Sequence, residues 1–169
     1  DDQSGDAEAL DQEAGAPAPL RSDMHEIRTE IEIDASAERV WSVLLDFPAY
    51  PEWNPFVRSI SGDPRPGGRL RVSLHPPGGR AMTFRPTVLA AVPDRELRWR
   101  GRLLLPGVFD GEHYFQIATV ATGRVRFTHG ERFSGLLVPL LKASLEQSTK
   151  AGFVAMNDAL RQRAERGGS

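Results

Sequence analysis

The first regular pattern in the chain lies between Glu26 and Ile33, where isoleucines alternate with charged residues. A period of two is typical of a strand with one buried face. Ser36 then occupies the position of a helix N-cap, and an apolar stripe continues to Asp46. The prolines that follow exclude another long helix. We therefore predict a strand, a helix and one short helical turn, which packs through the aromatic residues Phe47, Tyr50, Trp53 and Phe56.

Six further strands are predicted, separated by clusters of Gly, Pro and Asp. They cover residues 57–62, 68–75, 81–92, 96–104, 111–121 and 124–133. Such a series is typical of an antiparallel meander. Apolar residues alternate with arginines in two of these strands, which places Leu97, Trp99 and Phe127 on an inner face. The outer face then carries Arg98, Arg100, Arg102, Arg124, Arg126 and Arg132.

The last predicted element is one long amphipathic helix over residues 139–163, and Pro139 is acceptable in its first turn. Its apolar residues lie mostly three, four or seven apart: Leu141, Leu145, Phe153, Met156 and Leu160. An antiparallel sheet with one apolar face can bury that face only by curling around this helix. The predicted fold class is therefore α+β: a curved seven-stranded antiparallel sheet wrapped around a long C-terminal helix, with two short helices between strands 1 and 2.

Several segments together resemble the polyketide cyclase/dehydrase-like branch of the START/SRPBCC superfamily. They are Ala37–Asp46 (AERVWSVLLD), Pro51–Pro55 (PEWNP), Glu96–Trp99 (ELRW), Phe109–His113 (FDGEH) and Phe127–Gly135 (FTHGERFSG). The resemblance covers about 24–166 and implies a helix-grip fold, with a hydrophobic cavity between the sheet and the long helix. The hydrophobic cavity implies a small hydrophobic ligand. Because the superfamily includes binders, carriers and cyclases, the resemblance does not identify the substrate, and it supplies neither a metal nor a catalytic set.

Charge separates the first 23 residues from the rest of the chain. They hold seven acidic residues against Arg21 alone, although the whole chain carries a net charge of only −2. We expect residues 1–23 to form a flexible, dispensable acidic tail, and 24–166 to form one ligand-binding domain. The chain has no cysteine, which excludes disulfides and thiolate chemistry and favours the cytoplasm. No stretch approaches the roughly 20 apolar residues of a membrane span.

Two polar residues on the last predicted strand share the parity of its apolar positions. His129 and Glu131 should therefore point inward, about 6 to 7 Å apart. A three-residue turn at 121–123, with its glycine in the left-handed conformation, places His113 opposite Glu131 and Phe115 opposite His129. Residues directly opposite each other have Cβ atoms roughly 5 Å apart. We therefore predict a hydrogen bond between His113 and Glu131.

Three interpretations of His113, His129 and Glu131 remain open from the sequence. The side chains can satisfy one another as buried polar groups. They can recognise a ligand or exchange protons with a carbonyl compound, which makes all three candidate catalytic residues. Two histidines and a carboxylate can also bind a metal, but no ligand spacing such as HExxH supports this. We predict no metal and no other cofactor.

The remaining candidates form the wall of the predicted cavity. They are Phe84, Leu97, Trp99, Phe115, Phe127, Leu145, Phe153 and Met156. The outer arginines fit a solvated sheet face, because no nucleic-acid motif accompanies them. The predicted partner is a small hydrophobic molecule, without nucleic acid or membrane insertion, and both a monomer and a dimer remain open. The functions to be compared are a ligand-binding protein, a cyclase or dehydratase-like enzyme, and a partner-binding module.

Overall fold

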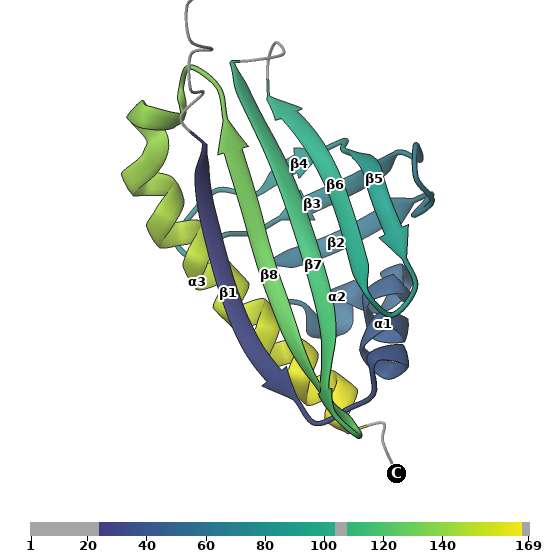
Figure 1. The fold of residues 1–169 in the computed structure, drawn as a ribbon. Coiled ribbons are helices and arrows are strands. Elements are labelled where there is room, and N and C mark those ends of the chain that lie inside the picture. The colour runs from purple at the N-terminus through teal and green to yellow at the C-terminus, as the bar shows by residue number, and fades with distance from the viewer. Residues whose placement is uncertain (1–23, 104–107, 167–169) are drawn as a thin grey trace, which may run out of the picture.

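A computed structural model describes residues 24–103 and 108–166, so the predicted tail lies outside the described residues. The elements follow one another in the predicted order of strand, helix, short helical turn, strands and long helix (Figure 1). They are β1 (His25–Ile33), α1 (Ala37–Leu45), the 3-10 helix η1 (Phe47–Ala49), α2 (Tyr50–Trp53), β2 (Val57–Gly62), β3 (Leu70–Leu74), β4 (Met82–Phe84), β5 (Thr87–Val92), β6 (Glu96–Leu103), β7 (Phe109–Ala121), β8 (Arg124–Ser134) and α3 (Val138–Glu165).

The strands form two antiparallel sheets. The large sheet has the order β1-β8-β7-β6-β5, and the small sheet has the order β2-β3-β4. A bridge between Arg69, directly before β3, and Thr87, at the start of β5, connects the two sheets. The α+β class, the antiparallel strands and the long C-terminal helix are confirmed. The prediction of one seven-stranded sheet is wrong, because the described residues form eight strands in sheets of five and three.

The difference arises within the predicted strand 81–92. The structure divides this segment into β4 and β5, which belong to different sheets and are separated by Arg85 and Pro86. Pro86 has no N–H and cannot donate a hydrogen bond within a ladder, so it interrupts the strand. Its carbonyl oxygen instead accepts a 2.9 Å hydrogen bond from the backbone of Leu70. The chain passes from one sheet to the other at this point.

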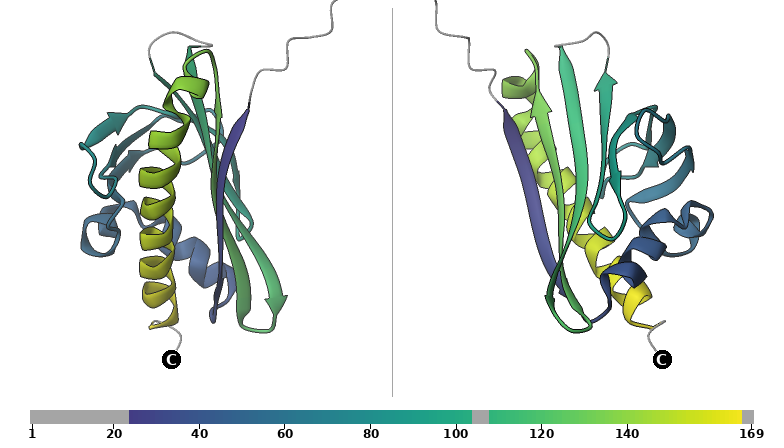
Figure 2. Two further views of the ribbon diagram at one scale, coloured as in Figure 1. Left: turned by 90° about the vertical axis from the view of Figure 1, so that its left-hand side faces the viewer. Right: turned by 45° about the vertical axis from the view of Figure 1, so that its right-hand side comes forward.

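Helix α3 and the small sheet lie on the same side of the large sheet (Figure 2). The helix crosses behind β1 and β8, whereas the small sheet lies behind β6 and β7 (Figure 1). The core between these layers includes Phe115, Phe127 and Phe153, whose exposed fraction is 0%. At the start of α1, the Ser36 hydroxyl accepts a hydrogen bond from the backbone of Arg39, which confirms the predicted N-cap. No helix within the described residues is long and apolar enough to cross a membrane.

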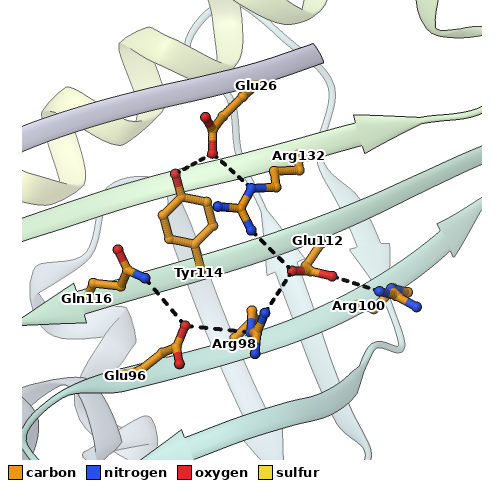
Figure 3. Close-up of polar contacts among 8 residues, drawn as sticks. All are labelled: Glu26, Glu96, Arg98, Arg100, Glu112, Tyr114, Gln116 and Arg132. Carbon is orange, nitrogen blue, oxygen red and sulfur yellow. Dashed lines mark hydrogen bonds and ion pairs between the residues drawn. The ribbon is translucent and has the colours of Figure 1, made fainter. Parts of the chain in front are cut away.

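The opposite face of the large sheet carries a network of charged residues around Tyr114 (Figure 3). The Tyr114 hydroxyl donates to Glu26 at 2.8 Å, and Arg132 donates to the same carboxylate oxygen at 2.9 Å. The tyrosine ring covers Gly130, where a Cβ atom would lie only 2.3 Å from it. All the arginines predicted on this face have acidic partners within 4 Å. Their charges are thus largely balanced by neighbouring carboxylates.

Candidate functional site

The pairing of β7 with β8 determines which side chains meet at the site. His113 lies opposite Glu131, and Phe115 lies opposite His129, so the predicted register is confirmed. The predicted turn is wrong in one detail. Ala121 pairs directly with Arg124, so the turn has two residues, and the register shift lies between residues 119 and 121. A bulged residue in the strand replaces the third turn residue and preserves the inward parity of the histidines.

A cavity of about 240 Å³ lies between the two sheets. Its walls are mainly apolar and include Phe56, Val72, Leu74, Phe84, Trp99 and Phe133. His113 and Glu131 also line it, whereas α3 contributes Thr149 among the described residues. The family resemblance implied a cavity between the sheet and the long helix. The described lining residues instead place the cavity mainly between the two sheets.

Two glycines keep this cavity open. Gly101 on β6 lies directly opposite Gly111 on β7, and both line the cavity. A Cβ atom at Gly101 would approach only the Pro86 side chain, at 4.0 Å, whereas one at Gly111 would lie 2.5 Å from Glu131 Oε1. Gly111 therefore allows the Glu131 carboxylate to lie close over β7. Neither glycine was predicted from the sequence, although both share the inward parity of Trp99 and His113.

A chain of polar side chains leads from the cavity into the core. Glu131 Oε2 lies 3.3 Å from His113 Nδ1, and His113 Nε2 lies 3.0 Å from His129 Nε2. His129 Nδ1 lies 2.9 Å from Asn157 Oδ1, and Asn157 donates through Nδ2 to Thr29 Oγ1 at 2.9 Å. These five residues, which we call the polar chain, come from β1, β7, β8 and α3. They satisfy one another, as the first interpretation requires.

Two members of the polar chain, Asn157 and Thr29, were not predicted from the sequence. Asn157 is buried, with an exposed fraction of 3%. It lies four residues after Phe153 and directly after Met156, within the apolar stripe of α3. A polar residue on the buried face of a helix needs a partner, and this was the available signal. Thr29 lies opposite His129 in the pairing of β1 with β8.

Aromatic rings hold the two histidines on either side. Trp99 is stacked on His113 with ring centroids 4.8 Å apart, and Phe153 is stacked on His129 at 3.7 Å. Of the predicted wall residues, Trp99 and Phe84 line the cavity. Leu97, Phe115, Phe127, Phe153 and Met156 are instead buried in the surrounding core. The side chain of Leu145 lies outside the described residues. The binding and catalytic roles of these residues stay predictions.

Burial, together with the neighbouring His113, holds the pKa of His129 well below its usual range. The hydrogen bond to Asn157 opposes this shift without reversing it. His129 is therefore neutral in the folded protein. In the part of the chain that the structure describes, no group of three or more His, Asp or Glu side chains is arranged to hold a metal ion. The site thus combines histidine and carboxylate side chains with an apolar cavity.

Acidification is expected to destabilise the protein through His129. Between its lowered folded pKa and the ordinary value of about 6.5, the unfolded chain binds a proton that the folded chain does not. The free energy of unfolding should therefore decrease as the pH is lowered, by up to about 1.4 kcal/mol per pH unit. Urea unfolding between pH 7 and 5 measures this slope. His129→Gln should make it shallower, and an identical slope in both proteins would contradict the assignment.

The comparisons with known proteins agree with this architecture. The family described as polyketide cyclase / dehydrase and lipid transport has a model that matches residues 24–165. The Zhui aromatase/cyclase from Streptomyces sp. R1128 superposes with a TM-score of 0.70 and 19% identity, over 85% of this chain and 94% of its own. A START superfamily protein from Mycobacterium smegmatis gives a TM-score of 0.66 and 23% identity, over 84% and 98%.

Norcoclaurine synthase from Thalictrum flavum is similar as well, with a TM-score of 0.69 and 14% identity over 89% of this chain and 99% of that one. No curated protein matches the sequence. At these identities the structural likeness concerns the fold, which is the helix-grip arrangement of an antiparallel sheet and a long C-terminal helix.

Proposed function

Because the chain belongs to the polyketide cyclase/dehydrase and lipid transport family, we propose that it binds a small hydrophobic ligand in the cavity between its two sheets. The observation that carries this proposal is an apolar cavity with His113 and Glu131 at its polar end. Such a combination of apolar walls and a few oriented polar groups is typical of small-molecule sites. The ligand class that fits is ring-containing or acyl.

The size and the walls of the cavity support a small and partly flat ligand. Its volume of about 240 Å³ is below the roughly 300 to 1,000 Å³ of drug-sized sites. The Trp99 ring forms part of the wall and offers an aromatic surface beside His113. His113 and Glu131 can then orient a carbonyl or hydroxyl group at one end of an otherwise apolar molecule.

Filling the cavity from Gly101 should abolish most of the binding. The new side chain of Gly101→Val enters open space, and valine favours a strand, so the fold should be retained. We expect the affinity for the neutral probe N-phenyl-1-naphthylamine to fall at least about tenfold, equivalent to about 1.4 kcal/mol. Fluorescence titration measures the dissociation constant.

Ala118→Val is the matched control, because Ala118 is exposed on the outer face of β7. It adds two methyl groups to a strand without entering the cavity, so its dissociation constant should equal that of the unmodified chain. Equal probe affinity in Gly101→Val and Ala118→Val would place the bound probe elsewhere and defeat the proposal.

A second candidate function is a cyclase or dehydratase-like enzyme that uses the same cavity. The contact of 3.3 Å between His113 and Glu131 at the cavity wall favours it, because a histidine beside a carboxylate can exchange protons with a carbonyl compound. Binding alone does not require such a pair. Proton exchange on a model carbonyl compound tests this candidate.

A further inference from the structure

We propose that the hydrogen bonds of the polar chain run in a single direction, which keeps one proton between His113 and Glu131, and that Asn157 is the positioning residue for this proton. The proton is held at the cavity wall, which both residues line. The ligand class that follows is an apolar molecule with a carbonyl oxygen. That ligand class rests on the proposed function, whereas the presence of one proton between His113 and Glu131 does not.

The direction of the hydrogen bonds is determined first at Thr29. Its hydroxyl donates to the backbone carbonyl of His129 at 3.2 Å, and a carbonyl can only accept. The single hydroxyl proton is thereby used, so the Thr29 oxygen can only accept from Asn157. The Asn157 amide must then direct its NH₂ group to Thr29 and its Oδ1 atom to His129.

The direction continues through the two histidines. Because Asn157 Oδ1 can only accept, His129 must carry its proton on Nδ1. His129 is neutral, so its Nε2 atom is an acceptor and His113 must donate to it through Nε2. His113 Nδ1 then faces Glu131 Oε2 at 3.3 Å. Two lone pairs would repel at this contact, so one proton lies between them, either on the imidazole or on the carboxyl group.

The groups around this contact are mostly apolar. Trp99 and Phe153 contact the His113 ring, and neither of them titrates. Among the described residues that line the cavity, Arg102 is the other charged group, and its guanidinium pairs with Asp110 at 3.6 Å. The proton at the contact of His113 with Glu131 is therefore the one best placed to reach a ligand.

This arrangement can interconvert the keto and enol forms of a bound carbonyl compound. The pair donates its proton to the carbonyl oxygen, and the Glu131 carboxylate removes a proton from the adjacent carbon. The C–H electrons form the new C=C bond, and the C=O bond becomes C–O–H. The pair holds one proton before and after the reaction, so no other reactant is needed.

The positions of the imidazole protons test the proposal directly in the full, ligand-free chain. Long-range 1H–15N correlation NMR at pH 7.5 distinguishes protonated from unprotonated ring nitrogens, with the exposed His75 as an internal reference. We expect protons on His129 Nδ1 and on His113 Nε2. A proton on His129 Nε2, or an unprotonated His113 Nε2, would overturn the proposal.

Asn157→Leu tests the positioning role. Without the Oδ1 acceptor, His129 can move its proton to Nε2 and donate to His113, which then needs only its Nδ1 proton to reach Glu131. We expect this tautomer change and the loss of one proton from the site. Asp158→Asn, on the same turn of α3 but paired with Arg161, should leave the tautomers unchanged. Unchanged tautomers in a folded Asn157→Leu protein would contradict the role.

The proposed function and this inference can fail separately. If N-phenyl-1-naphthylamine does not bind but the protons lie on His129 Nδ1 and His113 Nε2, the proposed binding site is wrong and the inferred direction of the hydrogen bonds stands. If the probe binds but His129 carries its proton on Nε2, the binding site stands and the inferred direction is wrong. If Asn157→Leu does not fold, the spectrum of the unmodified chain still decides the direction.

Discussion

Replacing Glu131 by glutamine is expected to slow the exchange of the α-protons of benzoylacetone at least about 100-fold, because acid–base catalysis by one positioned group contributes 10²- to 10⁴-fold. The amide cannot remove a proton from carbon, but it can still hydrogen-bond to His113. The stability of Glu131→Gln should therefore change little. Deuterium incorporation into this ring-containing diketone, followed by 1H NMR with a protein-free reference, measures the rate.

Two further variants show where the effect originates. Glu112→Gln removes a carboxylate from β7 on the outer face, where it pairs with Arg98 and Arg100, and the exchange rate should not change. Gly111→Ala places a Cβ atom 2.5 Å from the original position of Glu131 Oε1, so the carboxylate must move and the rate should fall. Equal rates in the unmodified chain and Glu131→Gln would defeat the enzyme candidate and leave the ligand-binding function.

The parity of strand residues could predict the centre of the site because β7 and β8 are adjacent in sequence and joined by a short turn. The inward positions of His113, His129 and Glu131 followed from the alternation around them, and the structure pairs His113 with Glu131 as expected. The register was predicted correctly although the predicted turn was one residue too long. An extra residue in the turn and a bulged residue in the strand change the alternation of the side chains in the same way.

Other parts of the site depend on contacts between segments far apart in the sequence. Asn157 and Thr29 are 128 positions apart, and no local pattern indicates that an amide on α3 meets a hydroxyl on β1. The location of the cavity follows from the interruption at Pro86, which separates the sheets. Composition and periodicity describe each strand well, but they do not state which sheet a strand joins.

Phe153→Ala is expected to lower the free energy of unfolding by about 3 to 5 kcal/mol, as large truncations in a core do. Phe153 is completely buried, stacks on His129 with centroids 3.7 Å apart, and meets the edge of Phe56 at 5.7 Å. Urea unfolding at pH 7.5 measures the loss. Val154→Ala, at an exposed position of α3, should change stability by no more than about 0.5 kcal/mol. A loss below about 1 kcal/mol for Phe153→Ala would mean that α3 does not hold His129 in place through this ring.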